Sequence, residues 1–322
     1  MKAIRFEQVG GPEVLKYVDV DLPPPGPGQV RVRHTAIGVN FIDTYHRSGL
    51  YKLPLPSGLG SEAAGVVDAL GDGVTSLKIG DRVAYAGALG AYAEASNVPA
   101  DKLVKLPQGV SDEVAAAAML KGMTVQYLLT RTYVVNPGET ILFHAAAGGV
   151  GLIAGQWAKH LGATVIGTVG SDEKVALAKA NGYDHVLNTR SDDWVKRVRE
   201  ITNGEGVPVV YDSIGKDTWS GSLDCLAVRG MMVSFGNASG AVPAFEPGIL
   251  SAKGSLYVTR PTLASYTRDA AELQDTANDL FAVLESGAVK IQINQRFKLA
   301  DAAKAHEALH SRQTTGATIL IP

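Results

Sequence analysis

The chain has 322 residues, a formal net charge of −2 and a hydrophobic fraction of 46%. This length predicts about two domains of roughly 150 residues each. The nearly balanced charge argues against a nucleic-acid partner, because binding to nucleic acid needs clustered Lys and Arg. The sequence has no uninterrupted run of about 18 apolar residues, the length that would span a membrane.

The sequence contains a single cysteine, Cys225, which excludes an intramolecular disulfide and a cysteine-rich zinc site. Cys225 lies in an apolar stretch with Leu223 and Leu226, so we expect it in a buried helix of the core. The N-terminal residues 1–6 alternate like a strand and lack the apolar core of a signal peptide. These features predict a cytoplasmic location.

The first 121 residues or so predict a β-rich domain. Strand-like segments at 29–35, 64–69, 82–86 and 92–98 are separated by turn clusters at 23–28 and 71–73. Ser111 is a candidate N-cap for a helix running through residues 115–120.

From about residue 124 to residue 259, short apolar strands alternate with amphipathic helices. The predicted strands cover 140–144, 163–169, 185–187, 207–211 and 231–235, and a helix covers 150–161. This alternation is typical of βαβ units and predicts an α/β fold with a parallel, doubly wound sheet. A helix over about 266–285 should end at Gly287, followed by a short helix and a final strand, 317–321, that packs against the first domain.

A glycine-rich turn at 145–151 connects the strand over 140–144 to the helix that follows it. This is the context of the dinucleotide-binding motif G-x-G-x-x-G, although Ala146 replaces its first glycine. Gly148 would let the backbone approach a pyrophosphate, and Gly151 would let the helix pack closely on the strand. The N–H groups at the start of the helix would bind the anion. The alternative is a glycine-rich turn that binds no ligand.

The end of the next strand indicates which dinucleotide binds. An NAD-preferring fold has Asp or Glu about 20 residues after the glycine turn, and this chain has Gly170 there, followed by Ser171 and Lys174. A hydroxyl and an ammonium group suit a 2′-phosphate, which favours NADPH. In the alternative interpretation, Ser171 only caps the next helix and Lys174 is a solvated surface residue.

Several motifs extend along nearly the whole chain: Gly38–Tyr51, Gly60–Val67, Lys121–Thr124, His144–Gly151, Tyr211–Ser213, Ser234–Asn237 and Tyr257–Pro261. With these motifs the chain resembles the zinc-free quinone oxidoreductase branch, which includes zeta-crystallin, of the medium-chain dehydrogenases/reductases. The resemblance implies a GroES-like catalytic domain over residues 1–123 and 261–322 and a Rossmann NADPH-binding domain over 124–260. It also implies an active cleft at the domain junction and assembly as a homodimer.

The residues at two metal-ligand positions distinguish this chain from zinc-dependent relatives. Those relatives have a Cys near the position of Asn40 and Gly-His-Glu where this chain has Gly60-Ser61-Glu62. The four-cysteine structural zinc lobe is absent as well. We therefore expect a zinc-independent enzyme, and the missing ligands argue against alcohol oxidation.

The resemblance also implies which residues form the site. The catalytic candidates are Asn40, which would orient the nicotinamide carboxamide or the acceptor carbonyl, together with Asp43, Tyr45 and Tyr51. The tyrosines would donate O–H bonds to a developing oxyanion or stack on a flat ring, although Tyr51 has the alternative of only packing in its loop. The cofactor candidates are Phe41, Ile42, Thr124, Gly148, Gly149, Val150, Gly170, Ser171, Lys174, Thr189, Arg190, Ser213, Phe235, Gly236, Val258, Thr259, Arg260 and Arg312.

Several relatives have a tyrosine at the strand end that here reads Asn188-Thr189-Arg190, so Thr189 or Arg190 would take its place at the adenosine phosphate. His144 is expected to be a structural hydrogen-bonding residue, and His34 and His46 are strand or surface residues. The three tryptophans are expected to pack on helices: Trp157, Trp194 and Trp219.

Three functions are compatible with these residues and motifs. The first is NADPH-dependent reduction of small quinones, and the second is NADPH-dependent reduction of activated C=C bonds with Tyr45 as the proton donor. The third is a dinucleotide-binding protein without turnover, used structurally or for RNA binding, against which the nearly neutral charge argues.

Overall fold

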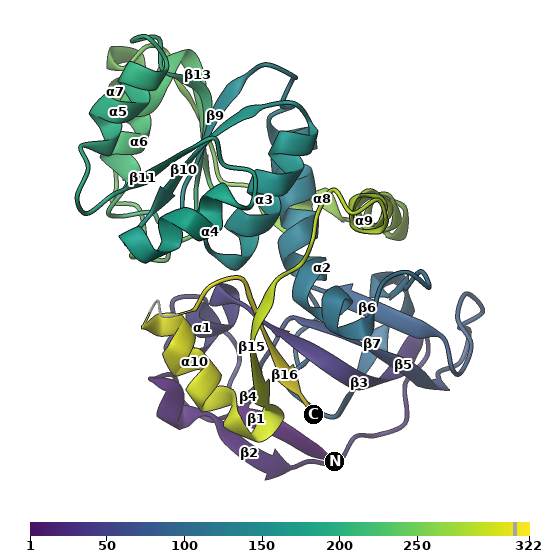
Figure 1. The fold of residues 1–322 in the computed structure, drawn as a ribbon. Helices are drawn as coiled ribbons and strands as arrows, with labels where there is room; N and C mark the ends of the chain where they lie inside the picture. Colours follow the sequence, from purple (N-terminus) through teal and green to yellow (C-terminus); the bar gives the residue numbers. More distant parts are fainter. Residues whose placement is uncertain (312–313) are drawn as a thin grey trace. The chain divides into compact units, whose positions relative to one another are not determined.

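The structure of this protein is a computed structural model that describes residues 1–311 and 314–322 (Figure 1). The chain divides into two compact units, which we call the first unit and the central unit. The first unit comprises Met1–Met123, Tyr266–Glu285 and Ile291–Pro322, and the central unit comprises Thr124–Ser265 and Ser286–Lys290.

The first unit is built on a mixed sheet in which both parts of the chain take part. Its strand order is β15 (Ile293–Lys298), β16 (Ala317–Ile321), β3 (Gln29–Val39), β5 (Glu62–Leu70), β6 (Arg82–Ala86) and β8 (Val104–Lys105), and β7 (Ala95–Pro99) also pairs with β3. The final strand β16 lies antiparallel to β3, with Ile319 opposite Gly38. The prediction that the C-terminal strand packs against the first domain is therefore confirmed.

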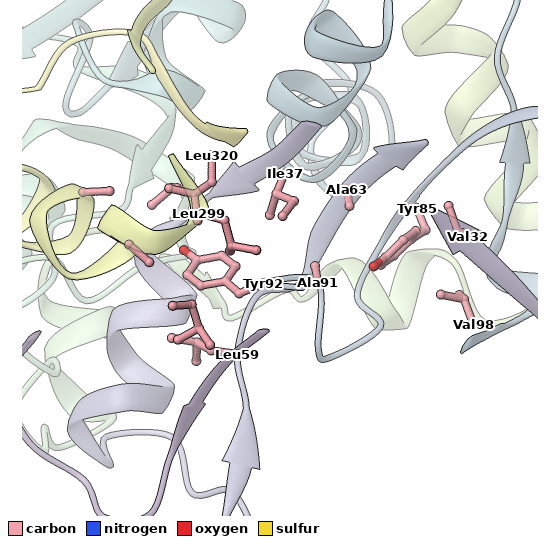
Figure 2. Close-up of a cluster of buried hydrophobic side chains, with 14 of the residues drawn as sticks. Val32, Ile37, Leu59, Ala63, Tyr85, Ala91, Tyr92, Val98, Leu299 and Leu320 are labelled. Atoms are coloured by element: carbon pink, nitrogen blue, oxygen red, sulfur yellow. The ribbon is translucent and has the colours of Figure 1, made fainter. Parts of the chain in front are cut away.

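A smaller sheet completes the β structure of the first unit, in the order β2 (Lys16–Asp19), β1 (Lys2–Phe6) and β4 (Ser57–Gly58). The two sheets share one apolar core. Tyr92, Leu59 and Leu299 lie in one part of this core and Tyr85 and Val98 in another (Figure 2). The strand alternation that predicted a β-rich domain thus reflects side chains that point into this core.

The helices of the first unit cover its sheets. They are α1 (Phe41–Ser48), α9 (Ala270–Glu285), α10 (Ala302–His310) and the first part of α2 (Asp112–Tyr127). The Oγ atom of Ser111 accepts a hydrogen bond from Val114 N at 3.3 Å, which confirms the predicted N-cap of α2.

The C-terminal part differs from the prediction in two places. The helix predicted to begin at about residue 266 begins at Ala270, because Asp269 accepts a hydrogen bond from Glu272 N at 2.9 Å and caps it there. A short helix α8 (Leu263–Tyr266) precedes this break. The strand β15 was not predicted, since its polar sequence INQRFK carries little strand propensity.

The central unit contains the predicted parallel sheet. Among the described residues its order is β11 (His185–Asn188), β10 (Thr164–Val169), β9 (Thr140–Phe143), β12 (Val207–Asp212), β13 (Leu226–Ser234) and β14 (Tyr257–Thr259). Counted from β9, this is the strand order 3-2-1-4-5-6 of a Rossmann fold, in which the order reverses between β9 and β12. The predicted fold class is confirmed.

Helices cover both faces of the parallel sheet (Figure 1). The helices α3 (Gly149–His160) and α4 (Val175–Lys179) lie on one face, and α5 (Trp194–Ile201) and α6 (Trp219–Cys225) lie on the other; a further helix is α7 (Gly248–Ala252). Cys225 is fully buried in the core, as predicted, and Trp157 and Trp219 are buried on α3 and α6. No helix in the described part of the chain has the length and apolar character needed to cross a membrane.

Candidate active site

The glycine-rich turn follows β9 and leads directly into α3. Gly148 is the N-cap of α3, and Leu152 N donates the first hydrogen bond of the helix to Gly148 O at 2.9 Å. The amides of residues 149–151 precede this bond, at the positive end of the helix dipole. A Cβ atom on Gly151 would lie 2.2 Å from Ala145 O, so only glycine allows the close approach that the sequence predicted there.

The residues predicted to bind the 2′-phosphate follow two neighbouring strands, β10 and β11. Val169 pairs with Asn188, and Thr189 N donates to Val169 O at 2.9 Å. This pairing places Thr189 and Arg190 beside the residues that follow β10, which begin with Gly170. The sheet therefore brings both groups of predicted residues to the same edge.

The environment of Gly170 is open. A Cβ atom there would have no heavy atom within 4 Å, and its φ lies outside the left-handed region, so the fold does not require glycine at this position. Ser171 occupies the N-cap of the 3-10 helix at 172–174, in extended backbone, and its side chain makes no capping hydrogen bond. The alternative in which the Ser171 hydroxyl caps this helix is therefore not what the structure shows.

A third group of predicted residues follows β12, β13 and β14. The guanidinium of Arg260 donates to Ser234 Oγ at 3.0 Å and to Gly236 O at 2.8 Å. A Cβ atom on Gly236 would lie 2.4 Å from Ser213 O, so the loops after β12 and β13 touch at this glycine. The other members of this group adjoin them: Phe235, Val258 and Thr259.

These three groups lie at the carboxyl ends of parallel strands. In open α/β sheets, ligands bind outside the carboxyl ends of the strands, at the point where the strand order reverses. The predicted cofactor residues from 148 to 260 therefore collect at the one edge of the central unit where this fold binds ligands, with the glycine turn at the reversal point. Thr124 lies in α2 rather than at a strand end, and Arg312 lies outside the described residues.

A buried polar network lies beneath this edge. The His144 ring contacts Thr168 Oγ1 at 2.8 Å and Ser222 Oγ at 2.9 Å, and Ser222 Oγ donates to Asp212 Oδ2 at 2.8 Å. Because the single hydroxyl proton of Ser222 goes to the carboxylate, His144 Nε2 must carry a proton and donate to Ser222. Burial lowers the pKa of His144, which keeps the ring neutral, so that Nδ1 accepts from Thr168.

This network supports the two loops that carry predicted cofactor residues. His144 directly precedes the glycine turn, and Asp212 Oδ1 accepts hydrogen bonds from Ile214 N at 2.8 Å and Gly215 N at 3.0 Å in the loop that begins at Ser213. The predicted structural role of His144 is confirmed. Its partners were not predicted, although Thr168 is a polar residue in the otherwise apolar segment 165–169, which was a usable signal.

We expect Ser222→Ala to lower the free energy of unfolding by about 1–3 kcal/mol, because it leaves the N–H of His144 without its buried partner and removes one of the two hydroxyl groups that donate to Asp212 Oδ2. The measurement is denaturant unfolding at pH 7. The control is Ser220→Ala, an exposed serine on the same helix. A change below about 0.5 kcal/mol, the size typical of surface substitutions, would contradict the assigned network.

In the first unit, α1 and the residues that flank it carry the side chains predicted for the nicotinamide and the acceptor. Phe41 is exposed, and its ring lies 6.4 Å from the ring of Tyr45, measured between centroids. The Tyr45 and Tyr51 rings are 5.2 Å apart in an edge-to-face arrangement, and Tyr51 N donates to Tyr45 O at 3.1 Å. The predicted aromatic residues therefore form one cluster, and Ile42, which follows Phe41 in α1, is half-buried.

Asp43 lies in the same helix and is fully buried. Its Oδ2 accepts hydrogen bonds from Asn40 N at 2.9 Å and from the Tyr92 hydroxyl at 3.0 Å, and Oδ1 lies 3.4 Å from Ser61 Oγ. The Asn40 bond caps the first turn of α1. Burial raises the pKa of Asp43 to about 7, while the hydrogen bonds from Asn40 and Tyr92 act in the opposite direction.

The hydrogen bonds to Asp43 continue to the C-terminal helix. Arg47 Nη1 lies 3.1 Å from His306 Nδ1, and His306 Nε2 lies 3.0 Å from the Tyr92 hydroxyl. Arg47 can only donate, so His306 Nδ1 accepts, Nε2 donates to Tyr92, and Tyr92 donates to Asp43. Burial and the charge of Arg47 lower the pKa of His306 to about 3, which agrees with a neutral ring.

Arg47, Tyr92 and His306 were not singled out from the sequence. His306 offered a signal, because it lies among buried positions of α10 that include Ala302, Ala305 and Leu309. His34, assigned to a strand or the surface, lies buried in β3 with its Nε2 2.9 Å from the Tyr85 hydroxyl, and His46 lies half-buried in α1.

The side chain of Asn40 is hydrogen-bonded as well. Its Nδ2 donates to Glu62 Oε2 at 2.8 Å, and the same oxygen lies 3.2 Å from the ammonium of Lys121. Glu62 is fully buried, and Lys121 is nearly so. The two positions at which zinc-dependent relatives have ligands, Asn40 and Ser61, are thus hydrogen-bonded to buried carboxylates. Within residues 1–311 and 314–322, no three His, Cys, Asp or Glu side chains group as a metal-binding set.

Comparison with known proteins gives a consistent result. Residues 26–108 match the family described as "Alcohol dehydrogenase GroES-like domain", and residues 149–279 match "Zinc-binding dehydrogenase". A quinone oxidoreductase of Pseudomonas aeruginosa is 59% identical to the chain, over 100% of the chain and 99% of that protein. A 2-haloacrylate reductase of a Burkholderia species is 48% identical, over 97% of the chain and 96% of that protein.

Among solved structures, an Escherichia coli quinone oxidoreductase complexed with NADPH is similar along its entire length. It superposes with a TM-score of 0.99 at 54% identity and covers 100% of both chains.

Proposed function

The chain belongs to the quinone oxidoreductase family of the medium-chain dehydrogenases/reductases, and on this basis we propose that it is an NADPH-dependent, zinc-independent quinone oxidoreductase. The observation that carries the proposal is the collection of predicted cofactor residues at the carboxyl edge of the parallel sheet, around a turn where only glycine fits at residue 151. The full-length similarity to quinone oxidoreductases supports the same conclusion.

The residues at this edge fit a phosphorylated dinucleotide. The amides of Gly149 and Val150 at the N-terminus of α3 would bind the pyrophosphate. Gly148 would let the backbone approach the same pyrophosphate. Ser171, Lys174 and Arg190 would hold the 2′-phosphate, with Gly170 and Thr189 beside them, and no acidic side chain projects from position 170 to repel it. Ser213, Phe235, Gly236, Val258, Thr259 and Arg260 would line the nicotinamide half, with Thr124 and Arg312 as further contacts.

When bound, NADPH supplies the reducing electrons and the hydrogen, and the protein supplies placement and polarity. In the catalytic domain, which we assign to residues 1–123 and 261–322, Tyr45 and Tyr51 would donate hydrogen bonds to the oxygen of the quinone on which negative charge develops. Asn40, Phe41 and Ile42 would border the nicotinamide, and Asp43 would hold the first turn of α1 that carries them. The Rossmann domain would comprise residues 124–260.

Zinc independence is supported by the residues at the ligand positions. The Asn40 amide donates to Glu62, and the Ser61 hydroxyl lies 3.4 Å from Asp43, so both side chains are engaged inside the protein. Neither an amide nor a serine hydroxyl is among the usual ligands of zinc. We also expect a cytoplasmic location, where the buried thiol of Cys225 would remain reduced.

A second candidate function is reduction of activated C=C bonds. The 48% identity to a 2-haloacrylate reductase favours it specifically. This reaction needs a proton donor in addition to the hydride, and the half-buried Tyr45 would serve as that donor. Quinone reduction requires less acid–base assistance from the protein, because the quinone is already a good acceptor of electrons.

Steady-state oxidation of NADPH and NADH by metal-stripped protein, with 1,4-benzoquinone and separately with an alkenal, tests both candidates. Rapid NADPH oxidation with the quinone is the expected result. Turnover of the alkenal alone would favour the second function. NADPH binding without turnover of either would leave a cofactor-binding protein and would overturn the proposal.

We further propose a homodimer formed through the open edge of the central sheet. The terminal strand β14 exposes 58% of Tyr257, and Val228 in the neighbouring strand is 73% exposed. An exposed edge strand with apolar side chains favours pairing with a second copy. Tyr257→Asp should lower the mass measured by light scattering from that of a dimer to that of a monomer, whereas Tyr17→Asp in the first unit should not. A monomeric wild-type protein would rule out the dimer.

A further inference from the structure

Three of the motifs that carry the family resemblance meet at one buried carboxylate. Glu62 is the first residue of β5 and is fully buried. Its Oε1 accepts from Leu120 N at 2.6 Å, and its Oε2 accepts from Asn40 Nδ2 at 2.8 Å and lies 3.2 Å from Lys121 Nζ. Asn40, Glu62 and Lys121 come from separate motifs in the sequence, and the described hydrogen bonds of the carboxylate connect them.

The backbone makes room for this carboxylate. A Cβ atom on Gly38 would lie 2.1 Å from Glu62 Oε2 and 2.3 Å from Ala116 O, so a larger residue at 38 would displace the side chain. The glycine of the Gly38-Val-Asn40 motif is therefore explained by the space that Glu62 occupies rather than by a turn. A fully buried carboxylate costs much free energy unless it is paired and hydrogen-bonded, and Lys121 provides the opposite charge.

The chemistry of the contact fixes the amide of Asn40. The carboxylate of Glu62 is paired with Lys121 and accepts hydrogen bonds, so the amide nitrogen of Asn40 must face it and the amide cannot be turned over without losing the bond. The backbone of the same residue is held by Asp43 Oδ2 at 2.9 Å. Both the position and the rotation of Asn40 are therefore determined by buried carboxylates.

We propose that Glu62 is a positioning residue for Asn40, and that Lys121 holds the Glu62 carboxylate in place for that purpose. The inference rests on the proposed function, in which Asn40 orients the nicotinamide carboxamide or the acceptor carbonyl. Small displacements of an orienting group are costly in catalysis, since about 1 Å of misplacement lowers a rate by up to about 100-fold.

A double-mutant cycle tests the proposal. In Glu62→Gln, an NH2 group replaces one acceptor oxygen of the carboxylate. This new donor faces another donor, either Asn40 Nδ2 or one of the other donors around the side chain, so a hydrogen bond is lost. We expect kcat for NADPH with 1,4-benzoquinone to fall about 10–100-fold, with a smaller change in KM for NADPH. Asn40→Ala should show a similar loss. The double variant should equal Asn40→Ala within about twofold, because Glu62 acts through Asn40.

The fluorescence of NADPH bound to the same four proteins gives a readout that needs no turnover. Bound nicotinamide emission reports the surroundings of the ring, and we expect Glu62→Gln and Asn40→Ala to change it alike, with no further change in the double variant. If the wild type binds NADPH but does not reduce the quinone, the proposed function fails, and the emission cycle still tests the positioning of Asn40.

The matched control is Glu94→Gln, a half-buried carboxylate of the first unit that accepts from Lys2 N at 2.8 Å. Any change that Glu94→Gln makes in kcat or in NADPH emission should combine independently with the change made by Asn40→Ala. If Glu62→Gln does not fold, Glu62→Asp retains the charge for Lys121 but withdraws the carboxylate from Asn40 by one methylene, and it should show the same coupling. Losses that multiply in the double variant, or a lowered unfolding midpoint with unchanged kcat and emission, would overturn the proposal.

Discussion

Gly170→Asp should lower kcat/KM for NADPH by about 10–100-fold and leave NADH unaffected or improved. A carboxylate at this position would repel the 2′-phosphate and compete for Ser171 and Lys174, and hydrogen bonds to charged groups are worth about 1.5–3 kcal/mol each. Each 1.4 kcal/mol corresponds to about tenfold in affinity. In NAD-preferring folds, an acid here binds the ribose 2′-hydroxyl instead.

The open surroundings of Gly170 make this substitution interpretable. A Cβ atom there has free space and an ordinary φ, so the new side chain introduces charge without strain. Gly170→Asn has nearly the same shape and no charge, and it should change the NADPH parameters by less than about threefold. Equal losses in both variants would show that shape rather than charge determines preference, and a full NADPH activity in Gly170→Asp would place the 2′-phosphate elsewhere.

Lys121→Met should lower the free energy of unfolding by about 3–5 kcal/mol, because it leaves the buried carboxylate of Glu62 without its opposite charge. The two side chains are only 8% and 0% exposed, so water does not replace the lost partner. Denaturant unfolding at pH 7 measures this loss. The double variant Glu62→Gln with Lys121→Met removes both charges and should recover part of the stability.

An exposed ion pair provides the control for Lys121. Lys196 and Glu200 on α5 are 4.0 Å apart, with side chains 70% and 43% exposed. Lys196→Met should cost less than about 1 kcal/mol, as is typical of surface pairs. If Lys121→Met lowers the free energy of unfolding equally little, the buried carboxylate of Glu62 does not depend on the ammonium group of Lys121.

The sequence was sufficient to predict the parts of the fold that depend on local periodicity. Strands β9 to β13 and helix α3 of the central unit follow from apolar runs of fixed period, and the glycine turn from its context between β9 and α3. The strands β14 and β15 were missed because one is three residues long and the other is polar, so both depend on pairing with neighbouring strands rather than on their own composition.

The candidate site was predicted where single residues carry the signal, as at Gly151 and Gly170. The partners of Asn40 and Asp43 were not, because hydrogen bonds over long sequence separation have no local pattern. Tyr92 and His306 are 214 residues apart in sequence and meet at 3.0 Å. Glu62 and Lys121 belonged to quoted motifs, yet nothing in the spacing of 59 residues showed that they form a pair.

The pairing of β16 with β3 has a consequence for the order in which the protein folds during synthesis. The sheet of the first unit takes its strands from residues 29–105 and from residues 293–321, so it remains incomplete until residues 317–321 have left the ribosome. The central unit, by contrast, takes nearly all of its residues from one continuous segment, 124–265. Domains generally fold as units during translation. The central unit should therefore fold first. Strand β3, with its apolar face, cannot pair with β16 until that strand has been synthesised, almost 280 residues later.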